Sequence, residues 1–316
     1  MDVSVVIPVY NAEKYIGQAV QSALDQPETA EIILVEDGSS DDSLTTCLRL
    51  AAMHDNVQVY THPWPRKNRG AAASRNLGIR KSHSQYIAFL DADDYYLANR
   101  FAPARRIFED HPNADGVYDA VQVEYMTEER RENWYIGEML TLSEPIKPGE
   151  LFETLILGTK GQFCANGIIV HRRIFGKTGG LFRKQIKVVE DTEMWFRMAA
   201  VGQLLPGQID HPVAIYRIHP ANKYLQPRTQ VQTLSMKVQV YAVLWRWARW
   251  HLPVDRKAFL YRWYFYLSHH LLKAAREEQG ILGLVRPMLY LGLLTGPRFL
   301  VDQLWGIVKS KRGLSS

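Results

Sequence analysis

The sequence predicts an α/β fold: a mixed, mainly parallel, Rossmann-like sheet flanked by helices, with a helical C-terminal extension. Two observations predict the sheet. Short apolar runs alternate with segments of helical spacing over residues 3–90, as in folds built from repeated strand–helix units. The last of these runs, residues 86–90, stops at the acidic run Asp91 to Asp94, and open parallel sheets place their ligands at the carboxyl ends of strands.

The first four elements form two strand–helix units. Residues 3–7 are an apolar run closed by Pro8, which predicts a short strand. Residues 13–24 carry apolar side chains three and four positions apart, which is the spacing of an amphipathic helix. Residues 31–35 predict the second strand, and a helix capped by Ser or Asp follows from residue 42 to about residue 53.

Three further elements lead to the acidic run. Residues 57–61 predict a third strand, and a Pro- and Arg-rich loop over residues 63–68 follows it. A helix over residues 70–81, rich in small side chains, then leads into the fourth strand, residues 86–90. Strands and helices that alternate at this spacing indicate a parallel sheet.

The chain is long enough for a catalytic domain of ordinary size plus an appendage. The 316 residues are 47% hydrophobic, which excludes a disordered protein. Only Cys47 and Cys164 are present, so we expect no disulfide framework, a reducing compartment, and thiols that are buried or inert. The chain begins directly in the first strand, without the basic and apolar segments of a secretory signal. We therefore expect a cytoplasmic catalytic face.

Residues 231–316 differ from the rest of the chain in charge. They hold 13 Lys or Arg against 4 Asp or Glu, a balance of +9, whereas the residues before them carry −4. Five of the eight tryptophans also lie there: Trp245, Trp247, Trp250, Trp263 and Trp305. This mixture is typical of a surface that binds anionic membrane or a protein partner, and no recognition motif favours nucleic acid. The apolar stretch 281–308 is interrupted by Arg, Pro and Asp, so it is a poor transmembrane helix.

The acidic run brings three carboxylates together at a strand end. Such carboxylates repel one another unless a cation or polar ligand joins them, so the run predicts a site for a metal ion and a diphosphate. The alternative is an acidic turn that caps the next helix. A second acidic pair, Glu190 and Asp191, opens a later helix, where negative charge also complements the helix dipole.

Five segments, in order, resemble the motifs of family 2 glycosyltransferases with the GT-A fold. They are VVIPVYN (5–11), VEDGSSD (35–41), GAAASRN (70–76), DADD (91–94) and ED (190–191). The resemblance covers roughly residues 3–220, and five motifs in register argue against an accidental match. It implies a donor-binding half over residues 1–104 and an acceptor-binding and catalytic-base half of the same domain over 105–230. Residues 231–316 then form the basic, aromatic-rich helical extension.

The resemblance implies roles for the carboxylates on the donor side. Asp93 matches the metal-binding position, and Asp91 matches the position that contacts the ribose or, through water, the metal. Asp94 ranks lowest of the three and is expected only to cap the following helix. Asp37 matches the acceptor for the imide N–H of the base, which favours uridine or thymidine. The alternative is a turn carboxylate that binds the backbone of residues 38–40.

Further donor-side and acceptor-side residues follow from the same resemblance. Pro8 and Tyr10 end the first strand, where Tyr10 can stack on the base; the alternative is packing in the core. Arg75 can reach the nucleotide from its helix, or form a surface salt bridge. In an inverting transfer, Asp191 matches the general base that takes the proton from the acceptor hydroxyl, and Glu190 orients Asp191 or the acceptor.

His219 lies in a Tyr-Arg-Ile-His segment that resembles the late Arg-x-His element of the family. The resemblance implies that this imidazole can complete the shell of Mn²⁺, although an all-oxygen shell for Mg²⁺ would not require it. A purely structural histidine is the alternative.

We therefore expect a metal-dependent, inverting glycosyltransferase that uses Mn²⁺ or Mg²⁺ and a nucleotide diphosphate sugar, with a UDP-sugar favoured. The expected acceptor is a glycan or a lipid-linked molecule in cell-surface polysaccharide biosynthesis, and the enzyme would be peripheral at the inner face of the plasma membrane. One alternative is a catalytically silent nucleotide-sugar-binding or scaffold protein. Asp93 and Asp191 together argue against it, because binding alone needs no base. A nucleotidyltransferase would carry a Gly-rich phosphate loop near the first strand, where this chain has the segment 10–13, YNAE.

Overall fold

The computed structural model describes residues 1–63, 67–126, 137–186, 188–220, 222 and 228–279. The chain divides into two compact units, Met1–Leu225 and Gln226–Ser316. The apolar stretch 281–308 and Trp305 lie outside the described residues. Among the helices that are described, none has the length and apolar character needed to span a membrane.

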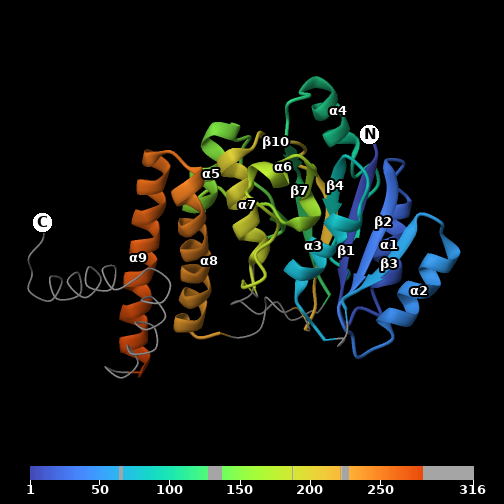
Figure 1. Ribbon diagram of the computed structural model, residues 1–316, viewed down its shortest axis with the longest axis horizontal. Helices are drawn as coiled ribbons and strands as arrows, with labels where there is room; N and C mark the ends of the chain where they lie inside the picture. Colours follow the sequence, from blue (N-terminus) through green and yellow to red (C-terminus); the bar gives the residue numbers. More distant parts are fainter. Residues whose placement is uncertain (64–66, 127–136, 187, 221, 223–227, 280–316) are drawn as a thin grey trace, which may run out of the picture. The chain divides into compact units, whose positions relative to one another are not determined.

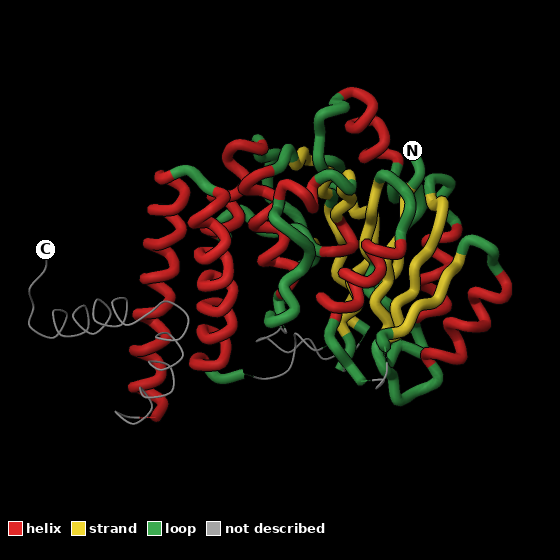
Figure 2. Tube along the Cα trace, viewed as in Figure 1, coloured by secondary structure: helices red, strands yellow, loops and turns green. Residues whose placement is uncertain are grey.

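The first unit is built on a seven-stranded sheet (Figures 1 and 2). Its strand order is β10 (Leu204–Pro206), β6 (Gly116–Tyr118), β9 (Ile168–His171), β4 (Tyr86–Phe89), β1 (Val3–Val9), β2 (Thr29–Glu36) and β3 (Val57–Thr61). The strands β1 to β4 run parallel, and β9 lies antiparallel between β4 and β6. The sheet is therefore mixed and mainly parallel, as the sequence predicts.

The strand β1 lies between β4 and β2, in the parallel part of the sheet. Every residue of β1 except Pro8 is buried, as expected for a parallel strand that is covered on both sides. Val5 pairs with Ile32 on one side and with Ala88 on the other. The carboxyl ends of β1, β2 and β4 consequently meet at one edge of the sheet, which brings Asp37 and the acidic run to the same edge.

Three helices pack on these strands. The apolar stripe of α1 (Ile16–Leu24) joins the core cluster of β1 and β2, and α2 (Ser43–Met53) contacts β3. The helix α3 (Ala71–Lys81) lies against β1 and β2. Gly78 permits this close approach, because a Cβ atom added there would overlap the Val6 side chain.

The first helix begins later than the sequence predicts. Residues 13–15 form a turn because the chain there is tied to the loop that follows β2. The side-chain Oδ1 of Asn11 accepts a hydrogen bond from the N–H of Ser40 at 2.9 Å. The N–H of Glu13 donates to Asp41 at 3.1 Å. These bonds join two loops at the edge of the sheet that carries the acidic run.

A second, four-stranded sheet follows the acidic run. Its order is β5 (Tyr95–Tyr96), β11 (Pro212–Ile218), β7 (Ala120–Tyr125) and β8 (Met139–Leu140). The strand β11 is antiparallel to β5 and parallel to β7. Because β5 comes directly after the acidic run, this pairing brings β11 beside the run. Elsewhere in the described part of the unit are α4 (Ala102–Asp110), α5 (Pro148–Leu157), η2 (Ala165–Gly167), α6 (Ile174–Lys177) and α7 (Glu190–Val201).

The described part of the second unit is a pair of long helices. The helix α8 (Gln230–His251) starts at a capping box, in which Thr229 and Gln232 bind each other's backbone N–H groups. The helix α9 (Val254–Gln279) runs back along α8, and the N–H of Val231 meets Glu278 at 3.1 Å (Figure 1). The predicted helical C-terminal extension is confirmed for these residues. Trp250 and Val254, at the turn between the helices, are 84% and 73% exposed.

Candidate functional site

The acidic run follows β4, and its three carboxylates have different surroundings. Asp91 and Asp93 are half-buried, whereas Asp94 is fully buried. Asp94 accepts hydrogen bonds from Nδ2 of Asn166 at 2.6 Å and from the N–H of Arg217 at 2.7 Å. The expectation that Asp94 caps a following helix is wrong, because β5 follows and the carboxylate points into the protein. Burial and the charges of Asp93 and Asp91 raise the pKa of Asp94 well above its ordinary value.

Asn166 fixes the turn of the acidic run. Its Oδ1 accepts a hydrogen bond from the N–H of Asp91 at 2.9 Å, while its Nδ2 binds Asp94. One fully buried amide therefore holds both ends of the run. Sequence reasoning missed this role. The only signal was a polar residue just before the apolar strand β9.

Arg75 joins the acidic run to the helix α7. Its Nη2 lies 2.7 Å from Oδ1 of Asp91, and its Nη1 lies 2.8 Å from Oε1 of Glu190. The guanidinium is buried, so the alternative of a surface salt bridge is wrong. Burial alone would lower the pKa of Arg75, but the carboxylates of Asp91, Glu190 and Asp191 outweigh it and raise this pKa. The side chain therefore stays charged and forms ion pairs with both Asp91 and Glu190.

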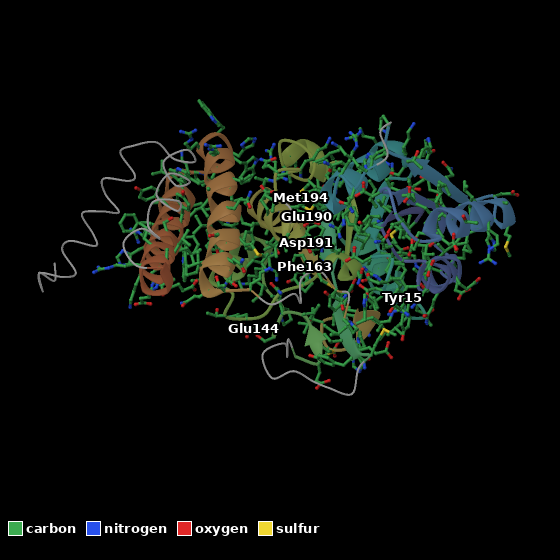
Figure 3. The ribbon with its side chains drawn as sticks, turned by 90° about the horizontal axis from the view of Figure 1, so that it is seen from below. Tyr15, Glu144, Phe163, Glu190, Asp191 and Met194 are labelled. Carbon is green, nitrogen blue, oxygen red and sulfur yellow. The ribbon has the colours of Figure 1, made fainter. Side chains whose placement is uncertain are left out.

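Glu190 and Asp191 form the first turn of α7, and Figure 3 shows them next to each other. The residue before them, Val189, has a φ of 58°, which is rare for a β-branched residue. Glu190 is buried, and burial raises its pKa although Arg75 partly offsets the effect. Asp191 is half-buried and accepts a hydrogen bond from the N–H of Thr192 at 2.8 Å. Of the two, Asp191 is the more exposed carboxylate.

His219 comes directly after β11 and faces Asp93. Its Nε2 lies 3.0 Å from Oδ2 of Asp93. Asn222, another residue that sequence reasoning missed, donates to the same oxygen at 3.3 Å and accepts from the N–H of His219. We call Asp93 and His219 the metal pair, because the sequence predicts both as metal ligands. The Asp93 side chain is 31% exposed and the His219 side chain 9% exposed, so the pair is reachable from outside mainly through Asp93.

The separation of Asp93 and His219 is compatible with two ligands of one divalent ion. With metal–ligand distances of about 2.1 Å, two adjacent ligands of one octahedral ion lie about 3 Å apart, close to the observed separation. The described residues contain no group of three or more His, Cys, Asp or Glu side chains placed to hold a metal. Ions such as Mg²⁺ commonly take only one or two protein ligands and complete their shell with phosphate oxygens and water.

Asp37 lies after β2 with little exposure. Its Oδ1 accepts from the N–H of Arg69 and its Oδ2 from the N–H of Gly70, both at 2.8 Å. The alternative that it binds the backbone of residues 38–40 is therefore wrong: its partners are at the start of α3. Each carboxylate oxygen has two acceptor positions, so these bonds leave capacity for a base.

Pro8 and Tyr10 lie at the carboxyl end of β1. Pro8 is half-buried, and the Tyr10 side chain is 48% exposed. Packing in the core, the alternative for Tyr10, is therefore excluded. The aromatic face is available to a ligand at the same sheet edge as Asp37. The two cysteines are free thiols, and burial raises the pKa of each to about 12. Cys164 lies near the acidic run, and the charges of Asp94 and Asp91 also raise its pKa.

The model of Glycosyl transferase family 2 matches residues 4–179, more than half of the chain. The succinoglycan biosynthesis protein ExoU of Rhizobium meliloti is 41% identical over 99 residues, which are 31% of this chain and 28% of ExoU. The chain spans 15%, 38% and 12% of the lengths of three other curated relatives that it matches.

Solved structures of glycosyltransferases share the fold. Residues 1–349 of S. aureus TarS, in complex with UDP-GlcNAc, match with a TM-score of 0.64 and 16% identity over 99% of this chain and 92% of that one. The mannosyltransferase PcManGT from Pyrobaculum calidifontis, in complex with GDP-Man and Mn²⁺, matches with a TM-score of 0.54 and 17% identity over 97% and 86%. These likenesses confirm the predicted fold class.

Proposed function

The chain belongs to glycosyl transferase family 2, and from this we propose that it is a metal-dependent, inverting glycosyltransferase. It moves a sugar from a nucleotide diphosphate sugar to a hydroxyl group of a glycan or lipid-linked acceptor. We place this transfer in cell-surface polysaccharide biosynthesis, an assignment supported by the similarity to a succinoglycan biosynthesis protein.

The observation that carries the proposal is the bridge made by Arg75. Through it, Asp91 at the end of β4 and Glu190 at the start of α7 share one cation. The donor-side carboxylates and the catalytic pair Glu190 and Asp191 are thereby held in one site. A silent binding protein has no need for this connection, because only transfer requires a base beside the donor.

On the donor side, Asp93 and His219 would hold the divalent ion, and Asp91 would contact the ribose. The ion would neutralise the charge that develops on the departing diphosphate. Asp37 would accept from the imide N–H of a uracil base, against which Tyr10 and Pro8 would lie. A UDP-sugar is favoured, and the likeness to a TarS structure that contains UDP-GlcNAc supports this choice.

On the acceptor side, Asp191 would take the proton of the attacking hydroxyl. Its half-exposed position at the start of α7 suits that role, since a general base must reach the acceptor within hydrogen-bond distance. Glu190, which is held by Arg75, would orient Asp191 or the acceptor. Attack from the side opposite the leaving diphosphate would invert the anomeric centre.

We also propose that the enzyme is peripheral at the inner face of the plasma membrane. The second unit supports this, because Trp250 and Val254 protrude from the turn between α8 and α9 with Arg249 exposed beside them. Exposed aromatic and basic side chains of this kind bind the interface of anionic membranes.

Calorimetry with UDP-, GDP-, TDP- and CDP-sugars, in the presence of Mn²⁺, Mg²⁺ or a chelator, tests the donor site. We expect metal-dependent binding of one nucleotide class, and loss of that binding in Asp93→Ala. Asp191→Asn should bind the same donor normally but release almost no nucleotide diphosphate from it. If the intact protein binds the donor but releases no nucleotide diphosphate from it, either to an acceptor or to water, that result replaces this proposal with the scaffold alternative. Failure to bind any donor would contradict both.

A further inference from the structure

Arg217 holds the acidic run from the neighbouring strand β11. Its backbone N–H donates to Oδ1 of Asp94 at 2.7 Å. Its side-chain Nε donates to the carbonyl of Asp93, and Nη2 donates to the carbonyl of Asp94 at 3.4 Å. The residue is buried and lies two positions before His219. Arg217 therefore contacts the backbone of Asp93 and lies two residues before His219 in the chain.

The guanidinium is itself held in place by α1 and β5. Its Nη1 donates to Oε1 of Gln18 at 2.8 Å. Its central carbon lies 5.0 Å from the ring centre of Tyr15 and 5.0 Å from that of Tyr95. The Tyr15 ring, labelled in Figure 3, also lies 5.0 Å from the ring of His219. One packed group therefore supports both members of the metal pair.

These contacts argue against a direct role in donor binding. Arg217 is buried, and three of its five guanidinium N–H groups, one on each nitrogen, bind oxygen atoms of the protein. A cation placed to grip a diphosphate would instead direct free N–H groups toward the exposed side of Asp93.

We propose that Arg217 is a positioning residue, which fixes Asp93 opposite His219 before a metal ion binds. It acts through the Asp93 carbonyl and through Tyr15. These contacts hold Oδ2 of Asp93 and Nε2 of His219 3.0 Å apart. This inference rests on the proposed function, because it takes Asp93 and His219 as metal ligands. Residues that orient metal ligands in this way typically change metal affinity about 10–100-fold when they are replaced.

Mn²⁺ binding to the full chain without donor, followed by electron paramagnetic resonance and calorimetry, tests the proposal. We expect Arg217→Gln to weaken Mn²⁺ binding about 10–100-fold. Arg217→Lys should weaken it as well, because lysine keeps the charge but not the planar fork or the ring contacts. In donor turnover, both variants should need more Mn²⁺ for activation, while kcat at saturating Mn²⁺ recovers toward that of the unmodified protein.

Arg172 offers a matched control. Its three guanidinium nitrogens also bind backbone carbonyls, those of Ser84 at 3.1 Å, Ile79 at 3.0 Å and Ser82 at 2.7 Å. Arg172→Gln should therefore lower thermal stability without changing Mn²⁺ affinity. Tyr95→Leu keeps the arginine but removes one ring, and it should weaken Mn²⁺ binding in the same direction. This variant carries the test if Arg217→Gln fails to fold.

The outcomes separate this inference from the proposed function. If the unmodified protein binds Mn²⁺ and Asp93→Ala does not, but the Arg217 and Tyr95 variants bind it normally, the positioning role is overturned and the metal pair stands. Equal losses of affinity in Arg217→Gln and Arg172→Gln would also overturn it, because they would indicate general destabilisation. If the unmodified protein binds no Mn²⁺, with or without UDP, both ideas fail.

Discussion

Nη1 of Arg75 lies 2.8 Å from Oε1 of Glu190, in a buried ion pair that joins α3 to α7. The other arm of the same guanidinium binds Asp91. Breaking a buried ion pair by removing one partner is strongly destabilising, because the remaining charge is uncompensated. Arg75 should therefore matter both for the ionisation of Glu190 and for the position of α7.

Arg75→Gln tests that role through the pH dependence of activity. Burial already raises the pKa of Glu190 and Arg75 lowers it, so removal of Arg75 should raise this pKa further. Glu190 must be ionised to orient Asp191 or the acceptor, so we expect kcat to fall about 10²–10⁴-fold and the acid limb of kcat/KM, where Glu190 becomes protonated, to move to higher pH. Arg80→Gln, at an exposed position of the same helix, is the control and should leave both unchanged. An acid limb that does not move in Arg75→Gln would contradict the coupling.

Asp94 and Asp93 should respond differently to replacement by alanine. Asp94→Ala leaves the buried Nδ2 of Asn166 and the N–H of Arg217 without an acceptor. Each such loss costs about 1–3 kcal/mol, so the free energy of unfolding in urea should fall clearly. Asp93 is partly exposed, and Asp93→Ala should change this free energy little while it abolishes metal binding. The reverse order of stabilities would contradict the structural role of Asp94.

Two helical glycines make opposite predictions for the same substitution. An added Cβ at Gly78 of α3 would overlap Val6, so Gly78→Ala should destabilise the protein by about 1–3 kcal/mol. Nothing lies within 4 Å of a Cβ added at Gly17 of α1, so Gly17→Ala should stabilise it by about 0.5–1 kcal/mol. Thermal unfolding of both variants measures this contrast. A stable Gly78→Ala protein would mean that α3 can move away from β1.

Trp250 provides a test of membrane association. Burying an apolar side chain is worth about 1.5–3 kcal/mol, so the double variant Trp250→Ala and Val254→Ser should lose roughly ten-fold or more in binding to anionic vesicles. Flotation with phosphatidylglycerol vesicles measures this loss, and neutral phosphatidylcholine vesicles should bind little of either protein. Met53, 66% exposed on α2, is the control, and Met53→Ala should float normally. Equal flotation of all variants would argue for another surface or for a protein partner.

Local sequence predicts the strand–helix units of β1 to β4 well, because Pro, Gly or acidic turns close each apolar run within a few residues. The second sheet was not predicted. The strands β5 and β8 are two residues long, and so short a segment has no measurable period. The pairing of β11 with β7 depends on packing rather than on any local signal.

The candidate site divides in the same way. The acidic run and the pair Glu190 and Asp191 were recognisable as motifs, and Asp93 and His219 were chosen together through the family resemblance. The supporting residues were not recognisable. Asp94 meets its partners Asn166 and Arg217 at separations of 72 and 123 residues, and no sequence periodicity specifies a contact at that range. The residues around Arg75 in the sequence do not indicate that its side chain would form ion pairs with two carboxylates, Asp91 and Glu190.

Arg217 in β11 and His219 directly after it come late in the chain, so they are synthesised long after the acidic run that they contact. Asp93 and His219 are 126 positions apart. At roughly 5–20 residues per second, a ribosome needs about 6–25 s to proceed from one to the other. Throughout that interval the acidic run lacks Arg217 and His219, and for most of it Asn166 as well. The residues of β1 to β4 are synthesised before this interval begins, whereas β6, β9 and β10 of the same sheet are synthesised within it. The site can therefore be completed only after most of the first unit has been synthesised.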